Sequence, residues 1–322
     1  MRATLVYNPW AGDEQQHTGE LLLEKLEAAG YEARLVSDKR MLERTLEDPG
    51  ELVVVAGGDG SVKQVAIELA GRGIPMAILP MGTANNIAKS LGGLGVVDEL
   101  IAGWRSAERR RLRVGSVIGG RGTMRFVESA GVGLFTELVT RGQEEVEDNA
   151  AGLTGHEIDR GLLLLRRITE EHAPRYRRVT LDGSDLSGDY LLVEAMNIPL
   201  LGPNVPLAPE ADSSDGLLDL VLVTGRERSG IEDYLRARLG GAAARLELPS
   251  RRGARVVLQA SPAELHVDDD AWKPEPHIDR RPEDRAEGEV SIGLGTEDEG
   301  VEVLVPGAGR TKRDGAAAGA SQ

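Results

Sequence analysis

The sequence predicts two domains: an α/β domain with an open, mostly parallel sheet and helices on both faces, then a β-rich, sandwich-like domain. Three observations favour this fold class. The 322 residues suffice for about two domains. The first third alternates apolar runs with helical patterns, and the run Leu52–Ala56 is wholly apolar, as is typical of a strand buried on both faces of a parallel sheet. From Arg113 onward, short apolar runs alternate with Gly- and Pro-rich turns.

Four strands and four helices alternate in the predicted first domain, which indicates right-handed crossovers. The helical pattern is clearest after the third strand, where Val62, Val65, Ala66 and Leu69 have the spacing of one helical face. The predicted strands are Ala3–Tyr7, Glu32–Val36, Leu52–Ala56 and Ile74–Leu79. Three more helices are predicted. The first ends at Gly30, the second spans Lys39–Leu46, and the last follows the segment Pro80–Ala84 and ends at Gly92-Gly93.

The predicted second domain begins with a hairpin, in which Arg113–Ile118 and Met124–Ser129 are joined by a glycine-rich turn. Helices are expected around Ile158–Ile168 and Ile231–Leu239. The remaining predicted strands are Val179–Leu181, Asp189–Met196, Leu217–Val223, Arg255–Gln259, Glu264–Val267, Glu289–Ile292 and Val301–Val305. The domains are therefore expected at residues 1–112 and 113–300, and the small, polar tail 306–322 is expected to be disordered.

Composition excludes several classes of function. The chain has no cysteine, which rules out disulfides, zinc–thiolate sites and cysteine nucleophiles. A net charge of -15 argues against nucleic acid as a partner. No apolar segment has a membrane helix's length and no signal peptide is apparent, so a cytoplasmic protein is expected. The basic runs Arg109–Arg113 and Arg175–Arg178 are either solvated faces or patches that meet phosphates or lipid headgroups.

Three glycine-containing loops follow strands of the predicted parallel sheet: Asn8–Gly12, Gly57–Ser61 and Pro80–Thr83. Ligands bind at this edge of an open α/β sheet, where glycine lets backbone N–H groups approach a phosphate. Tight turns also use glycine without any ligand, so each loop alone is a weak signal. The sequence contains no P-loop motif, and Gly57-Gly58-Asp59-Gly60 does not match the dinucleotide-binding pattern G-x-G-x-x-G, so a P-loop NTPase is excluded and a Rossmann dinucleotide site is disfavoured. Asp59 either caps the helix that follows it or holds a water bound to Mg²⁺ against phosphates.

The segments YNPWAG, VVVAGGDGSVKQV and LPMGTANNIAKSLG, in this order, resemble the diacylglycerol kinase catalytic domain family, which includes soluble bacterial lipid kinases, sphingosine kinases and ceramide kinases. FVESAGVGLF, LAPEADSSDGLLDLVLV and LHVDDDAW resemble later segments of the same family. The resemblance extends from Ala3 to about Pro306. It implies that ATP binds in a cleft between the two domains, and that Val301–Val305 returns to the first.

The resemblance also implies roles for individual residues. ATP would contact residues of the three loops and of the second strand's end: Asn8, Pro9, Gly12, Ser37, Gly57, Gly58, Asp59, Gly60, Ser61, Thr83 and Asn85. A structural Mg²⁺ or Ca²⁺ would bind at Asp212, Asp215 and Leu217, although an Asp-Gly turn alone also explains that segment. Asp268 and Asp270 match the family's catalytic segment, with Asp270 as the base and Asp59 as an acidic partner. Three consecutive aspartates also suit a solvated turn.

Several positions depart from the family pattern. Asn86 and Arg113 stand where the family commonly has aspartate, Ala11 replaces a serine, and Asp270 replaces a glutamate. The resemblance implies an ATP- and Mg²⁺-dependent lipid kinase that docks transiently at the inner membrane face. The alternatives are an inactive nucleotide- or lipid-binding protein of the same fold and an NAD kinase-like enzyme. The sequence leaves the lipid and the oligomeric state, a dimer included, open.

Overall fold

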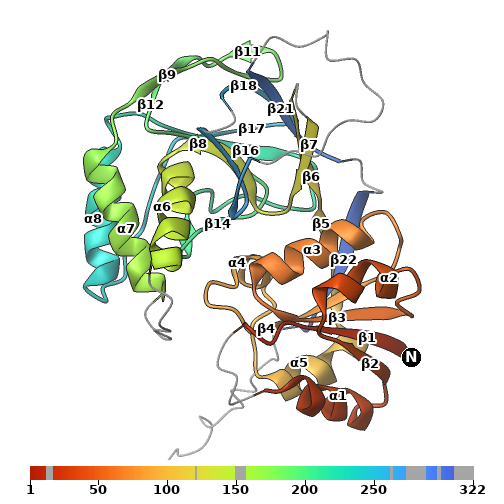
Figure 1. Ribbon diagram of the computed structural model, residues 1–322. Coiled ribbons are helices and arrows are strands. Elements are labelled where there is room, and N and C mark those ends of the chain that lie inside the picture. Colours follow the sequence, from red (N-terminus) through yellow and green to blue (C-terminus); the bar gives the residue numbers. More distant parts are fainter. Residues whose placement is uncertain are drawn as a thin grey trace, which may run out of the picture.

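A computed structural model describes residues 1–11, 17–119, 122–148, 157–261, 264–272, 288–295 and 299–307. Two domains lie one above the other in Figure 1, with the N-terminal domain below. Most of the tail 306–322 and the predicted site residue Gly12 lie outside the described residues. No described helix is long and apolar enough to cross a membrane.

The first domain contains a six-stranded sheet in the order β2-β1-β3-β4-β22-β5. All neighbours in this sheet pair in parallel except β22 and β5, which are antiparallel. The strands are β1 (Arg2–Tyr7), β2 (Glu32–Val36), β3 (Leu52–Gly57), β4 (Met76–Pro80), β5 (Glu108–Arg113) and β22 (Gly300–Val305). The helices are α1 (Gly19–Ala28), η1 (Lys39–Met41), α2 (Leu42–Leu46), α3 (Asp59–Leu69), α4 (Asn86–Ser90), α5 (Val97–Gly103) and η2 (Trp104–Ser106).

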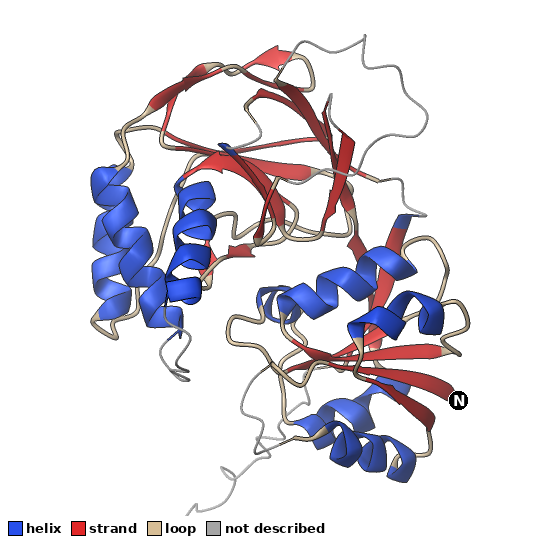
Figure 2. Ribbon diagram, viewed as in Figure 1, coloured by secondary structure: helices blue, strands red, loops and turns tan. Residues whose placement is uncertain are grey.

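Helices cover both faces of this sheet, as Figure 2 shows, and the prediction of an open α/β domain is confirmed. Alternate residues of β3 divide the core, because successive side chains of a strand point to opposite faces. Val53 and Val55 pack with α2, α3 and α4, whereas Leu52 and Val54 pack with α1 and α5. Every residue of β3 is buried, as its apolar sequence predicts.

The predicted hairpin at the start of the second domain is wrong in its boundaries. Arg113 ends β5, which pairs with β22 at the edge of the first sheet. The hairpin instead joins β6 (Gly115–Gly119) to β7 (Gly122–Phe126), and a further strand, β8 (Ser129–Gly133), begins at Ser129. The sequence pattern does not predict β5, because four arginines on this edge strand hide the alternation of a strand.

Two six-stranded sheets make up the second domain, in the orders β11-β10-β18-β21-β6-β7 and β17-β16-β13-β8-β19-β20. A shared core lies between them, so the sandwich-like, β-rich domain is confirmed. Further strands are β9 (Arg175–Arg177), β10 (Val179–Leu181), β11 (Ser184–Asp185), β12 (Gly188–Tyr190), β13 (Leu192–Met196), β14 (Leu200–Leu201), β15 (Val205–Pro206), β16 (Leu218–Val223), β17 (Ser250–Gly253), β18 (Arg255–Gln259), β19 (Leu265–Val267), β20 (Asp270–Ala271) and β21 (Glu289–Leu294).

Three helices pack on the outer face of the second of these sheets (Figure 2). They are α6 (Leu134–Asp148), α7 (Glu157–Glu171) and α8 (Arg228–Leu239). The sequence predicts α7 and α8 but not α6, which begins directly after β8 without a turn signal. Leu134 and Phe135 of α6 join Leu192 and Met196 of β13 in this second core. The start of α6 is thereby held close to the first domain, where it forms one wall of the site described next.

Candidate functional site

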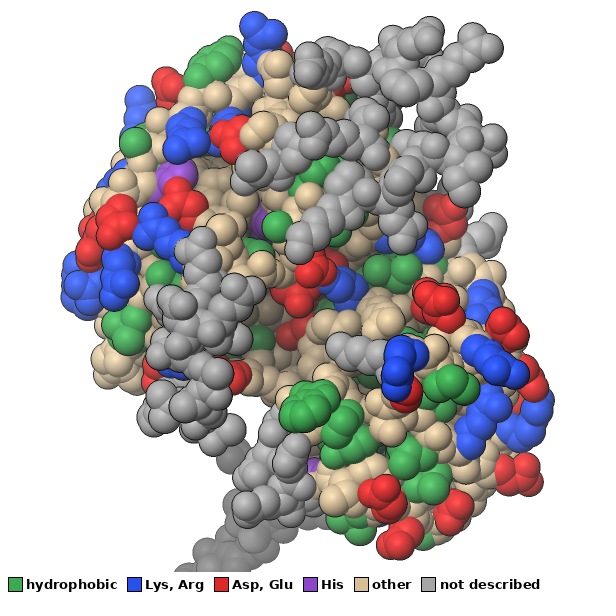
Figure 3. All heavy atoms as spheres, viewed as in Figure 1, with side chains coloured by type: hydrophobic (Ala, Val, Ile, Leu, Met, Phe, Trp, Pro, Cys, Tyr) green, Lys and Arg blue, Asp and Glu red, His purple; other side chains and the backbone are tan. Residues whose placement is uncertain are grey.

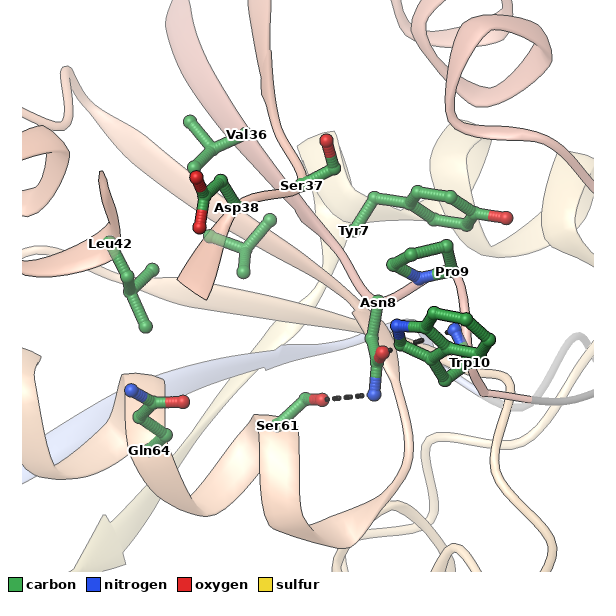
Figure 4. A pocket seen from close by; sticks show the side chains of 11 residues that line it. Tyr7, Asn8, Pro9, Trp10, Val36, Ser37, Asp38, Leu42, Ser61 and Gln64 are labelled. Carbon is green, nitrogen blue, oxygen red and sulfur yellow. Dashed lines mark hydrogen bonds between the residues drawn. The ribbon is translucent and has the colours of Figure 1, made fainter. Parts of the chain in front are cut away.

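A cavity of about 390 Å³ lies at the carboxyl ends of β1 and β2, beside the start of α3 (Figure 4). Four residues predicted to contact ATP line it: Asn8, Pro9, Ser37 and Ser61. The Asn8 Nδ2 donates a hydrogen bond to Ser61 Oγ at 3.2 Å, which joins the first two loops. Trp10 also lines the cavity and is 86% exposed, so its indole face is available to a planar ligand.

Two of the glycine loops touch backbone to backbone. A Cβ atom added at Gly82 would lie 2.4 Å from the Gly58 Cα, and one added at Gly58 would lie 3.1 Å from the Gly82 Cα. Gly58 is the N-cap of α3, so this contact brings the third loop directly to the start of that helix. The two glycines are therefore required for packing, whether or not a phosphate binds there.

Asp59 caps a helix, but not the one that follows it in sequence. Its carboxylate accepts hydrogen bonds of 2.9 Å from the backbone N–H groups of Asn86 and Ile87, the first residues of α4. Burial raises the pKa of the Asp59 carboxyl, and these two N–H groups act against that effect. The residue thus joins α3 to α4 at the edge of a second cavity.

Thr83 and Asn85, which are predicted to contact ATP, form hydrogen bonds within the protein. Asn85 has φ +51° and binds the backbone of Gly82, donating to its carbonyl and accepting from its N–H at 2.9 Å. The Thr83 hydroxyl donates to the Glu157 carboxylate of α7. Asn85 therefore shapes this loop, and Thr83 connects it to the second domain.

A second cavity of about 630 Å³ lies between the two domains. Acidic side chains gather in the hollow between the domains in Figure 3. The polar end of this cavity contains Asp59, Asn86, Glu128, Asp268 and Asp269. Its apolar wall comes from α6 and β14 and comprises Phe135, Leu138, Val139 and Leu201. One end suits a charged or hydrogen-bonding group, and the other suits a hydrocarbon chain.

The three consecutive aspartates meet a lysine from the first domain. The Lys63 Nζ lies 2.5 Å from Asp269 Oδ1, 2.7 Å from Asp270 Oδ2 and 3.9 Å from Asp268 Oδ2. Burial alone would lower the pKa of Lys63, but the charges of Asp268 and Asp269 outweigh it and raise that pKa. Lys63 is thus a permanent cation that holds Asp269 and Asp270 at the domain interface.

The three aspartates have different surroundings. Asp268 is 2% exposed and its carboxylate accepts N–H bonds from Val127, Glu128 and Ser129. Burial raises the pKa of its carboxyl to about 6, although Lys63 and the N–H groups oppose the shift. Asp269 lines the second cavity, whereas Asp270 lies at the exposed start of β20. Asp268 is suited to fixing the turn, whereas Lys63 holds the other two carboxylates at the domain interface.

Two buried groups that were not predicted from the sequence lie beside these aspartates. His266 contacts Glu194 Oε2 at 3.0 Å and the Asp268 carbonyl at 2.8 Å through its two ring nitrogens. Burial alone would lower the pKa of His266, but Glu194 outweighs it and raises that pKa. Glu128 is 6% exposed and lines the cavity. Both lie in segments that resemble the family, FVESAGVGLF and LHVDDDAW, but only their spatial neighbours single out these two residues.

The predicted metal segment, residues 212–217, already contacts two arginines. Arg252 forms an ion pair with Asp215, whose other carboxylate oxygen accepts the Leu217 N–H at 2.8 Å. Arg113 donates to the Ser214 carbonyl at 3.1 Å and to the Gly295 carbonyl at 3.3 Å. Asp212 accepts from the Ser214 N–H and hydroxyl. Guanidinium groups thus already contact the Asp215 carboxylate and the Ser214 carbonyl, and a divalent cation at Asp212, Asp215 and Leu217 would compete with Arg252 for Asp215; the metal site stays a prediction.

Two family models match the chain. The model of the diacylglycerol kinase catalytic domain matches residues 2–117, and the model of the YegS C-terminal NAD kinase beta sandwich-like domain matches residues 145–280. Together they cover both domains of the fold.

Individual relatives are similar at modest identity. The diacylglycerol kinase of Bacillus subtilis (strain 168) is 26% identical over 251 residues, covering 73% of this chain and 77% of the relative. A YegS-like lipid kinase of Klebsiella pneumoniae (strain 342) is 29% identical over 234 residues, 69% of this chain and 74% of the relative. A solved structure assigned as a diacylglycerol kinase from Bacillus anthracis str. Sterne superposes with a TM-score of 0.69 over 95% of this chain and 96% of its own, at 20% identity.

Proposed function

Because residues 2–117 match the diacylglycerol kinase catalytic domain and residues 145–280 match the YegS C-terminal domain, we propose that this chain is a lipid kinase that transfers the γ-phosphate of ATP to a lipid hydroxyl. The observation that carries the proposal is the second cavity. Its carboxylate-lined end includes Asp59 and Gly60 of the glycine loop, and its far wall is apolar. A lipid headgroup bound there would lie beside the phosphates of a nucleotide held at the start of α3.

The nucleotide would occupy the first cavity. The base would stack on Trp10, and Asn8, Pro9, Ser37 and Ser61 would contact the sugar and phosphates. The triphosphate would lie along Gly57, Gly58 and Gly60, where the N-terminus of α3 favours negative charge. Gly12, Thr83 and Asn85 complete the proposed set of contacts. Mg²⁺ accompanying ATP would neutralise charge on the phosphoryl group as it is transferred.

The proposed base is Asp270, which the family resemblance places in the catalytic segment. It would accept the proton of the attacking hydroxyl, and Lys63 would hold its carboxylate in position at 2.7 Å. Asp268 would fix the turn through its three backbone N–H contacts. Asp269 also bonds Lys63 and lies on the cavity wall, so it is the matched control for Asp270.

The test is transfer of labelled γ-phosphate from ATP, with Mg²⁺, to lipids in mixed micelles. The panel contains diacylglycerol, phosphatidylglycerol, ceramide and a sphingoid base, with NAD as a soluble control. Asp270→Ala should lower kcat by roughly 100-fold or more, the usual contribution of a general base. Asp269→Ala should act mainly on KM.

Other outcomes separate the alternatives. A labelled NAD product without any labelled lipid would favour an NAD kinase-like enzyme. ATP binding without any product would indicate a nucleotide- or lipid-binding protein of the same fold. A larger loss of kcat in Asp269→Ala than in Asp270→Ala would reassign the base to Asp269.

A further inference from the structure

Two hydrogen-bond acceptors at the polar end of the second cavity lack adequate donors. Among the described residues, the Asn86 Oδ1 is buried without any hydrogen-bond partner. The Glu128 carboxylate has one described donor, the Asn86 Nδ2, at the long distance of 3.3 Å. Both residues line the cavity, and their exposed fractions are 2% and 6%. Buried acceptors of this kind are costly unless a ligand or a water molecule in the cavity supplies the donor.

The neighbouring acidic residues each have hydrogen-bond donors or a cation as partners. Asp59 accepts two backbone N–H bonds and Asp268 accepts three. Asp269 and Asp270 are paired with Lys63. Glu128 is therefore the one described carboxylate at this end of the cavity with neither a cation nor a strong donor.

The positions of both acceptors are fixed by the backbone. The Glu128 N–H donates to Asp268 at 2.7 Å, and its carbonyl accepts from the Asn197 N–H at 2.8 Å. The Asn86 N–H donates to Asp59, and its Nδ2 donates to the Gly202 carbonyl at 3.0 Å. These contacts fix the orientation of the Asn86 amide and leave its Oδ1 as the acceptor. The pair is rigid and prearranged, as a recognition site requires.

We propose that Glu128 and Asn86 bind the ammonium group of an amino-alcohol lipid, so that the acceptor of the proposed kinase reaction is a lipid of the sphingoid-base type. The inference rests on the proposed function. A neutral hydroxyl donates one hydrogen bond and would leave one acceptor unpaired, whereas an ammonium donates three. The positive charge also complements the excess of carboxylates in the cavity, and the apolar wall on α6 receives the hydrocarbon chain.

The electrostatics of Glu128 agree with a cationic ligand. Burial raises the pKa of its carboxyl well above the usual value, and the charges of Asp59, Asp268 and Asp269 add to this effect. The raised pKa favours the neutral carboxyl when no cation lies beside it, and an ammonium placed beside Glu128 would lower that pKa, restore the carboxylate and form a charge-assisted hydrogen bond. An anionic headgroup such as that of phosphatidylglycerol would increase the repulsion.

The experiment compares three lipids in mixed micelles with ATP and Mg²⁺: a sphingoid base, its N-acetyl derivative and diacylglycerol. N-acetylation keeps the hydroxyls and the chain but removes the charge. We expect the sphingoid base to have the highest kcat/KM and N-acetylation to lower it by roughly 10–100-fold, the value of a charge-assisted hydrogen bond. Glu128→Gln, which preserves shape, should lower kcat/KM for the base by a similar factor and lower that for diacylglycerol by a clearly smaller one.

Two controls accompany the variant. Glu170→Gln makes the same change on the exposed face of α7 and should alter neither substrate. Equilibrium dialysis of the sphingoid base against the full chain measures binding without turnover. Loss of this binding in Glu128→Gln, with no product from any lipid, would support the ammonium site while contradicting the proposed kinase function.

The inference would be overturned by equal turnover of the base and its N-acetyl derivative. A Glu128→Gln variant that loses activity equally on all lipids would also contradict it, because the residue would then act in the reaction rather than in selection. Efficient turnover of diacylglycerol alone, with no binding of the base, would overturn the ammonium site and leave the kinase proposal standing.

Discussion

The buried carboxylate of Asp268 both fixes the turn of three consecutive aspartates and affects the stability of the fold. It has φ +53°, is almost fully buried, and accepts three backbone N–H bonds from the segment between β7 and β8. Such a carboxylate is fixed in position but costly to ionise. Its burial raises the pKa to about 6 in spite of the nearby Lys63.

This pKa predicts a pH dependence of folding. The value in the unfolded chain is near 3.8, so the native state favours the protonated form of Asp268. Its contribution to stability is therefore fully present below about pH 4 and is lost as the pH rises through about 6. We expect the wild type to lose about 2 kcal/mol of unfolding free energy relative to Asp268→Asn between pH 4.5 and 7, because about 1.5 pKa units of the shift lie above pH 4.5 and each is worth about 1.36 kcal/mol. Urea unfolding at pH 4.5 and 7 measures the difference; parallel pH profiles would contradict it.

At the scale of elements, the loops that follow β3 and β4 depend on each other for their packing. Gly58 begins α3 and Gly82 precedes α4, and their backbones are in direct contact. Asp59 adds a second connection by capping α4. The phosphate-binding loop proposed here is therefore one unit made from two chain segments.

We expect Gly82→Ala to destabilise the protein by roughly 2–3 kcal/mol, because its Cβ would lie 2.4 Å from a backbone atom that cannot move aside. Gly58→Ala should cost less, since its Cβ would lie at 3.1 Å. The control is Gly230→Ala in α8, where nothing lies within 4 Å and the change should stabilise by about 0.5–1 kcal/mol. Chemical denaturation gives all three values, and equal costs at positions 58 and 82 would argue against a tight contact.

The segment 212–217 is a second case in which contacts between elements matter more than the local motif. Arg113 from the end of β5 and Arg252 from β17 supply positive charge to this segment. Arg113 also binds the Gly295 carbonyl, just after β21. Arg113 thus connects the segment 212–217 to both places where the chain crosses from one domain to the other.

We expect the unfolding temperature of the wild type to be the same in EDTA and in millimolar Ca²⁺ or Mg²⁺. The double variant Arg113→Ala with Arg252→Ala should be less stable, and Ca²⁺ should raise its unfolding temperature by about 2–5 °C because the freed oxygens can bind the ion. Adding Asp215→Asn should abolish that rescue. A wild type that Ca²⁺ stabilises through Asp215 would show that the arginines do not exclude the metal.

At the scale of the whole molecule, the proposed substrate must reach the site from a membrane although the net charge is -15. Arginines of both basic runs form ion pairs. On β5, Arg109 pairs with Glu302 and Arg110 with Glu108. On and after β9, Arg175 pairs with Glu264 at 3.4 Å, and Arg175 and Arg178 are exposed beside Tyr176, which is 64% exposed. An aromatic residue flanked by arginines suits a membrane interface.

We expect Arg175→Glu with Arg178→Glu to weaken binding to phosphatidylglycerol vesicles by roughly 30-fold or more, from about 1 kcal/mol per basic residue near an anionic surface. Arg40→Glu with Arg44→Glu, on the first domain, makes the same charge change as a control and should have little effect. Vesicle co-sedimentation at constant ionic strength measures both. Equal loss in the two double variants would point to net charge instead of a docking face.

The sequence by itself determined the α/β sheet, the β-rich second domain and the glycine loops, because apolar periodicity and turn residues are local signals. It also placed Asn8, Ser37 and Ser61 at one edge, since strands of a parallel sheet end together. Only the tertiary structure decided which helix Asp59 caps, that Lys63 meets the three aspartates, and that Glu128 faces Asn86. Each of these contacts joins segments at least 27 residues apart, and no local pattern encodes such a pairing.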